Sequence, residues 1–247
     1  MAEIYLVRHG QAGQNALRNA HEGRFEDDYD NLSDLGRRQA AATGHSLVAR
    51  GQAGVPVIHG PLNRQRDTAA AVASELDSPT PTIDEAWKEI RFGDMLAPWL
   101  REDPERAGLL AQAWKGKLAP EKTSAVNRQL FTAISQWSDG EEFAAFRDTV
   151  RAGLDRAAQV ALDRADRGDK GSVVVVSSGG PIAMCATEAL PGAPWMKLMR
   201  TIANGSVTVL GVKDGSHGPQ VSLRSLNEFA HLDEPAADGS HPLRTLG

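Results

Sequence analysis

Residues 173–176 are four consecutive valines, and this run constrains the fold more than any other feature of the chain. β-Branched side chains favour strands, and an unbroken apolar run is typical of a strand that is buried on both faces. Such strands lie inside parallel sheets that helices cover on either side. The 247 residues include 41% hydrophobic and 24% charged residues, which is usual for a globular chain with a sizeable core.

Shorter apolar runs predict further strands, at residues 4–7, 55–58, 82–83, 206–212 and 221–226. Segments with helical patterns separate them, at residues 34–50, 64–76, 141–167 and 181–190, and Ser33 can cap the first of these. Strands that alternate with helices predict an α/β fold with three layers: a mostly parallel central sheet with helices on both faces.

Residues 95–140 interrupt this alternation, since they hold large aromatic residues in helical surroundings and no strand pattern. We interpret them as a helical cap insertion that covers a site, and the alternative is a pair of ordinary packing helices. Residues 1–233 are therefore expected to form a single domain. Residues 234–247 are rich in Pro, Gly, Ser and Asp, which predicts a flexible tail.

Composition excludes several functional classes. The net charge of −5 and the aromatic content of 5% argue against nucleic-acid binding, which needs excess Lys and Arg or stacking platforms. No apolar run reaches 18 residues and the first residues do not resemble a secretory signal, so we expect no membrane partner and a cytoplasmic protein. The single cysteine, Cys185, excludes an intrachain disulfide and a zinc site built from several cysteines.

Polar side chains follow several of the predicted strands, where the carboxyl ends of parallel strands meet at one sheet edge. They include Arg8 and His9 after the first strand, His59 and then Arg64 after the second, Glu89 after the third, and Ser178 and Gly179 after the valine run. These groups suit a phosphate ester. Guanidinium groups and helix N-termini bind its oxygens, and an imidazole can attack its phosphorus.

Other chemistries lack their motifs. A Gly-x-Ser-x-Gly sequence fails at Ser178, because Val176 stands in place of the first glycine. The chain has no phosphate-binding Gly-x-x-x-x-Gly-Lys-Ser/Thr loop, no Gly-x-Gly-x-x-Gly and no His-Glu-x-x-His. We therefore expect neither a nucleotide cofactor nor a catalytic metal.

Five sequence blocks occur in order, at residues 6–11 (Leu-Val-Arg-His-Gly-Gln), 32–40, 61–69, 89–94 and 227–232. Together they resemble the histidine phosphatase superfamily, the phosphoglycerate mutase-like proteins, over residues 3–232. The resemblance implies that His9 is a nucleophile that becomes phosphorylated, that Arg8 and Arg64 hold the phosphoryl oxygens, and that Glu89 protonates the leaving group. It also implies that Asn15 contacts phosphate and that the insertion shapes the choice of a small phosphorylated substrate.

One block departs from the family, because Ser178 stands where a second catalytic histidine is expected. A hydroxyl still donates a hydrogen bond, but it carries no positive charge. We hypothesise that His59 supplies the missing cationic contact, and the alternative is a histidine that bonds only to backbone at the end of a strand.

The leading functional prediction is a metal-independent phosphomonoester hydrolase that acts through phosphohistidine at His9. The alternatives are a mutase-type phosphotransferase and a degenerate member that binds a phosphorylated ligand without turnover. The substrate and the oligomeric state stay open.

Overall fold

The computed structural model describes residues 2–13, 30–90, 96, 99–103, 105–114, 116–138, 140–233 and 243–245. The chain divides into two compact units. The first comprises Met1–Glu89 and Val150–Gly247, and the second comprises Ile90–Thr149.

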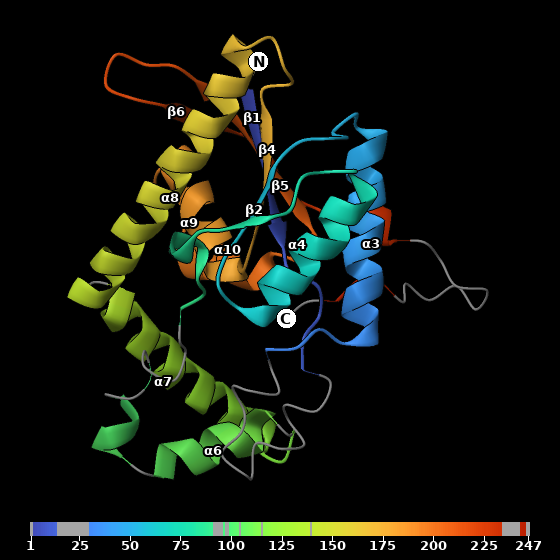
Figure 1. Ribbon diagram of the computed structural model, residues 1–247. Helices are drawn as coiled ribbons and strands as arrows, with labels where there is room; N and C mark the ends of the chain where they lie inside the picture. The colour runs from blue at the N-terminus through green and yellow to red at the C-terminus, as the bar shows by residue number, and fades with distance from the viewer. Residues whose placement is uncertain are drawn as a thin grey trace. The chain divides into compact units, whose positions relative to one another are not determined.

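The first unit is built on a six-stranded sheet with the order β3-β2-β4-β1-β5-β6 (Figure 1). The strands are β1 (Ala2–Arg8), β2 (Val57–His59), β3 (Thr82–Ile83), β4 (Ser172–Ser177), β5 (Val207–Lys213) and β6 (Gln220–Glu228). β3, β2, β4 and β1 are mutually parallel, whereas β5 is antiparallel to both β1 and β6. The predicted α/β fold with a mostly parallel sheet is confirmed, and the two late strands add an antiparallel edge.

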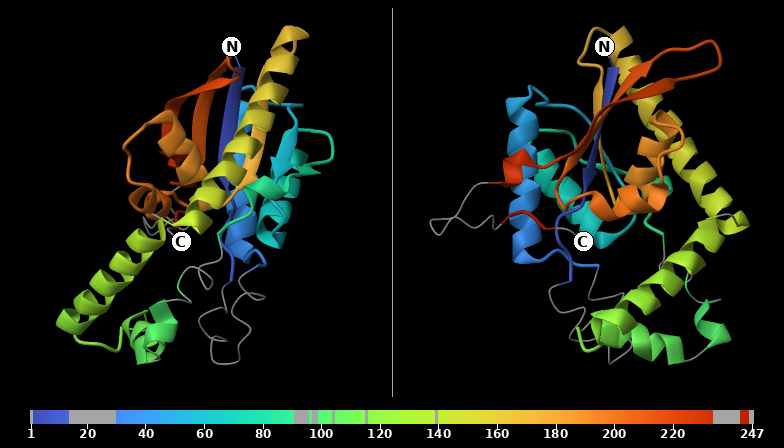
Figure 2. Two further views of the ribbon diagram at one scale, coloured as in Figure 1. Left: turned by 90° about the vertical axis from the view of Figure 1, so that its left-hand side faces the viewer. Right: turned by 180° about the vertical axis from the view of Figure 1, so that it is seen from behind.

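Helices cover both faces of this sheet (Figure 2). α3 (Asp34–Ala49) and α4 (Asn63–Glu75) lie on one face, and α8 (Glu141–Asp166) from Val150 onward, α9 (Gly179–Ala189) and α10 (Trp195–Thr201) lie on the other. Short 3₁₀ turns follow β3 and β6, namely η2 (Glu85–Trp87) and η3 (Ala230–Leu232). The sequence analysis predicted neither α10 nor these turns.

The valine run lies in β4, at the centre of the core, with no solvent exposure at any of its four residues. Val174 and Val176 belong to the apolar cluster that also holds Leu47 of α3 and Val72 of α4. The start of α3 is also as predicted, since the Ser33 hydroxyl accepts a hydrogen bond of 3.0 Å from the Gly36 amide.

The second unit contains α6 (Glu105–Trp114), α7 (Pro120–Ser138) and the beginning of α8, and its described residues include no strand. That it caps a site stays a prediction. In neither unit does a described helix combine the length and the apolar character that crossing a membrane requires.

Part of the tail that the sequence predicts to be flexible is held in place. Leu243 is buried, and its carbonyl accepts a hydrogen bond of 2.5 Å from the side-chain amide of Gln39. The Thr245 carbonyl accepts another, of 3.0 Å, from the backbone of Asn204. Residues 234–242 and 246–247 lie outside the described residues.

Gly36 provides a test of how α3 meets the segment after β1. A methyl group at Gly36 would lie 2.1 Å from the Gln11 carbonyl oxygen, which no packing tolerates. Gly36→Ala is expected to lower the free energy of unfolding by about 2 kcal/mol, as overpacking does, in urea titrations followed by circular dichroism.

Gly108→Ala is the matched control, because Gly108 also lies in a helix but has no atom within 4 Å of the added methyl group. This change should stabilise α6 by about 0.5–1 kcal/mol. Equal effects of the two substitutions would contradict the close approach of α3 to Gln11.

Candidate active site

His9 lies directly after β1 and is almost fully buried. Its Nδ1 lies 2.7 Å from the Gly10 carbonyl oxygen, and its Nε2 lies 3.1 Å from Nε of Arg64 at the start of α4. A carbonyl oxygen only accepts and a guanidinium only donates, so these partners fix the tautomer. Nδ1 carries the proton, and Nε2 presents its lone pair toward Arg64.

Arg64 is itself buried and oriented by a carboxylate. Its Nη1 lies 3.0 Å from Oδ1 of Asp30, and the other oxygen of Asp30 accepts a hydrogen bond of 3.1 Å from the Asn63 amide. Asp30 therefore sits at the N-terminus of α4, where a negative charge is favourable, and aims the guanidinium at His9.

Arg8 is the last residue of β1 and directly precedes His9. Its side chain is buried and donates a hydrogen bond from Nη1 to the Ile202 carbonyl. A methyl group added to Gly179 would lie 3.9 Å from Arg8 Cζ, so the guanidinium lies beside the N-terminus of α9. Two arginines from separate elements thus lie near the carboxyl ends of β1 and β4.

Glu89 follows η2 and accepts a hydrogen bond of 3.2 Å from the Gly180 amide in the first turn of α9. A methyl group at Gly180 would lie 2.3 Å from Glu89 Oε1, so the carboxylate occupies the space that the glycine leaves open. The structure therefore brings this carboxylate to the same helix terminus as Arg8.

Ser178 is fully buried and its hydroxyl oxygen accepts a hydrogen bond of 2.9 Å from the Gln65 side-chain amide. Arg8 of β1 is paired with Ser177 of β4, and the His9 amide donates to the Ser177 carbonyl at 2.9 Å. Ser178 therefore follows β4 at the level where His9 follows β1. That it stands in place of a second histidine stays a prediction.

His59 ends β2 and is paired with Val176, two residues before Ser178. Its Nδ1 lies 2.7 Å from the Gly60 carbonyl oxygen, the same backbone contact that His9 makes with Gly10. This contact matches the backbone-bonded alternative, and the cationic role of His59 stays a prediction. Asn15 lies outside the described residues.

Three polar residues that the sequence analysis missed hold the backbone around His9. Thr68 accepts from the Gly10 amide at 3.1 Å, Asn204 donates to the His9 carbonyl at 3.2 Å, and Gln39 accepts from the Gln11 amide at 2.7 Å. Thr68 and Gln39 lie inside the sequence blocks quoted above, which could have indicated them. No sequence signal marks Asn204 or Asp30.

The surroundings of His9 favour its neutral form. Burial lowers its pKa well below the ordinary value of 6.5, and the positive charges of Arg64 and Arg8 lower it further, while the bond to Gly10 acts weakly in the opposite direction. The neutral imidazole, which has a lone pair on one ring nitrogen, is the nucleophilic form of histidine.

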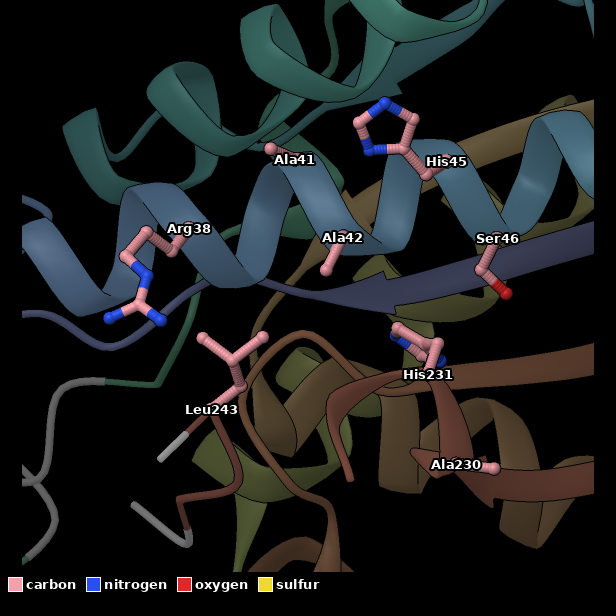
Figure 3. Close-up of a pocket in the computed structure, with 8 residues that line it drawn as sticks. All are labelled: Arg38, Ala41, Ala42, His45, Ser46, Ala230, His231 and Leu243. Carbon is pink, nitrogen blue, oxygen red and sulfur yellow. The ribbon is translucent and has the colours of Figure 1, made fainter. Parts of the chain in front are cut away.

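A separate pocket of about 660 Å³ lies between α3, η3 and Leu243 (Figure 3). Its lining includes Arg38, His45 and His231 but none of the residues around His9. Among the described residues there is also no cluster of three or more His, Cys, Asp or Glu side chains that could hold a metal ion.

A buried neutral imidazole in contact with one arginine and next in sequence to another, near a helix N-terminus, is an arrangement that suits an anionic group such as a phosphate. The model of the histidine phosphatase superfamily (branch 1) matches residues 4–224, and the chain belongs to this family.

Relatives of the chain include both mutase-like proteins and phosphatases. It is 27% identical to phosphoglycerate mutase-like protein 4 of Arabidopsis thaliana, over 94% of this chain and 88% of that protein. It is 29% identical to glucosyl-3-phosphoglycerate phosphatase of Mycolicibacterium vanbaalenii, over 77% of this chain and 75% of that protein. The fold resembles the native structure of a mycobacterial glucosyl-3-phosphoglycerate phosphatase, with a TM-score of 0.58 and 21% identity over 93% of this chain and all of that one.

The lowered pKa of His9 predicts a pH dependence of stability. Between the folded pKa and 6.5 the unfolded chain binds more protons than the folded chain. Stability is therefore greatest above pH 6.5 and falls as the pH drops through this window, by up to about 1.4 kcal/mol per pH unit for one proton. His9→Gln should show a shallower decline than wild type in urea unfolding between pH 6.5 and 5.

His45→Gln serves as the control, because His45 is an exposed histidine of α3 that pairs with Glu75. This variant should keep the steeper decline of the wild type. If His9→Gln and wild type lost stability in parallel, His9 would not be held neutral by the fold.

Proposed function

We propose that the protein is a phosphomonoester hydrolase that uses His9 as its nucleophile and passes through a phosphohistidine. The observation that carries the proposal is the contact of His9 Nε2 with Arg64, together with the bond that keeps the proton on Nδ1. It supplies both a lone pair and an adjacent cation for the charge of the phosphoryl group.

In the first step the phosphoryl oxygens take the guanidinium groups of Arg8 and Arg64 as partners. Because Arg64 then donates to the substrate, the lone pair of His9 Nε2 is released to attack phosphorus. The P–Nε2 bond forms as the P–O bond to the leaving group breaks. The guanidinium charges neutralise the transferring group, so the proposed step requires no metal ion.

Glu89 in its protonated form gives its proton to the departing alkoxide, which leaves as an alcohol. In the second step a water molecule gives a proton to Glu89 and attacks phosphorus, the P–Nε2 bond breaks, and inorganic phosphate leaves. Histidine and carboxylic acid are then both restored. The position of Glu89 at the α9 terminus, beside Gly180, supports this role.

Ser178 favours hydrolysis over the mutase alternative, because a neutral hydroxyl offers less support to a second phosphoryl group than a histidine cation does. The phosphatase among the relatives is consistent with this choice and suggests a small phosphorylated metabolite as substrate. The same serine is the feature that favours the non-catalytic alternative, a protein that binds a phosphorylated ligand without turnover.

His59 is proposed as an additional phosphate contact. An unchanged rate in His59→Ala would exclude this role of His59.

The proposal predicts that p-nitrophenyl phosphate is hydrolysed and that His9→Ala abolishes the reaction. The exposed Arg66 is two residues from Arg64 and pairs with Asp67, so Arg66→Ala is a matched control that should keep the wild-type rate. Arg64→Ala should lower the rate about 100-fold or more, as loss of an oriented charge donor does. Tight phosphate binding with no release by the wild type would favour the non-catalytic alternative.

The role of Glu89 predicts a dependence on the leaving group. An alkoxide needs a proton as it departs, whereas p-nitrophenolate is stable without one. Glu89→Gln should therefore lower kcat/KM about 100-fold or more for an alkyl phosphate but much less for p-nitrophenyl phosphate. Equal losses for the two substrates, measured side by side, would exclude Glu89 as the proton donor.

A further inference from the structure

Ser178 occupies the N-cap position of α9, but its hydroxyl cannot serve as the cap. An N-cap side chain accepts from the backbone amides two or three residues ahead. Here the Gly180 amide donates to Glu89, and Pro181 has no N–H. The need to cap the helix therefore does not explain why a serine stands at this buried position.

Gln65 determines how the Ser178 hydroxyl is used. Its Oε1 accepts from the Leu62 amide at 3.2 Å, and its Nε2 donates to the Trp87 carbonyl at 2.9 Å. If the amide were flipped, Gln65 Oε1 would face the Trp87 carbonyl oxygen, and two acceptors cannot bond. The partners therefore fix the positions of Oε1 and Nε2. The second hydrogen of Nε2 then points at the Ser178 oxygen, 2.9 Å away.

It follows that the Ser178 oxygen is an acceptor toward Gln65 and that its own hydrogen is left to donate. Within the part of the chain that the structure describes, no group accepts that hydrogen. The neighbouring Ser177 differs, because its hydroxyl donates to the Trp87 carbonyl at 2.8 Å. A buried hydroxyl whose O–H has no acceptor is suited to donate a hydrogen bond to a ligand.

The space around Gln65 is shaped for this side chain. A methyl group at Gly60 would lie 2.3 Å from Gln65 Oε1 and 2.5 Å from the Trp87 carbonyl oxygen. The glycine therefore leaves the room that the amide fills, and the amide has one packed position. Because Gln65 is fully buried, solvent does not compete for its hydrogen bonds.

We propose that Gln65 is a positioning residue that holds Ser178 as a neutral hydrogen-bond donor to the phosphoryl group on its way to His9. This proposal rests on the proposed function, because the donor is directed at the group that His9 receives. It replaces the charged contact expected from a histidine with an oriented hydroxyl. Ser178 would touch the substrate, whereas Gln65 would act only through Ser178.

The test is a double-mutant cycle with Ser178→Ala, Gln65→Met and the double variant, assayed on p-nitrophenyl phosphate. Ser178→Ala should lower kcat about 100-fold, as loss of an oriented donor in the transition state does, and should change KM far less. Gln65→Met should lower kcat about tenfold in the wild-type background and hardly at all when Ser178 is already alanine. A structural role of Gln65 would lower kcat equally in both backgrounds, which would overturn the proposal.

Ser177→Ala is the matched control, because Ser177 is equally buried but its hydrogen is already bound to Trp87. It should change kcat by less than about threefold. If Gln65→Met does not fold, Gln65→Leu takes its place: leucine also removes the amide that orients Ser178 and adds no charge, so kcat should again fall only when Ser178 is present. An unchanged kcat in Ser178→Ala would overturn the proposal while leaving the hydrolase intact.

Binding of inorganic phosphate, followed by calorimetry in the same variants, separates the two proposals. If the wild type hydrolyses no ester, the proposed function fails. The double-mutant cycle can still be evaluated from the Kd of each variant for inorganic phosphate. Weaker phosphate binding in both single variants, with no further loss in the double variant, would support the oriented hydroxyl. Equal Kd values in all variants would overturn it.

Discussion

The whole site depends on one fixed proton. The Gly10 carbonyl takes the hydrogen of His9 Nδ1, and Arg64 can only donate to Nε2, so the imidazole has a single tautomer and a single reactive nitrogen. Burial and the charges of Arg64 and Arg8 keep that nitrogen unprotonated. A phosphoryl group bound by the arginines would then meet a lone pair and not a proton.

The first turns of α4 organise much of this arrangement. Arg64 contacts His9, Gln65 contacts Ser178, and Thr68 accepts from the Gly10 amide and donates to the Arg64 carbonyl at 2.8 Å. One helix thus holds the ends of β1 and β4 together. The close approach of Gly36 to the Gln11 backbone secures the same segment from the side of α3. Hydrogen bonds from several elements hold His9 and its backbone, which explains how a residue just past a strand has one fixed orientation.

The sequence was sufficient for the features that rest on local patterns. The valine run marked the central strand, Ser33 marked the start of α3, and the ordered blocks indicated His9 and its arginines. The antiparallel direction of β5 could not be predicted, because an apolar run has the same appearance in either direction.

Contacts between residues distant in the sequence were also beyond prediction. Gln65 and Ser178 are 113 positions apart, and Asn204 and His9 are 195 apart, so no spacing relates them. The resemblance predicts a histidine at the position of Ser178, but only the hydrogen-bond network suggests how the hydroxyl could be used.

Detection of the intermediate tests the central claim most directly. The wild-type protein would be mixed with a phosphate ester, quenched with alkali within milliseconds to preserve phosphohistidine, and examined by ³¹P NMR and by mass spectrometry of its peptides. The account predicts a single phosphoryl group on Nε2 of His9. A phosphoryl group on Nδ1 or on another residue, or turnover without any phosphorylated protein, would contradict it.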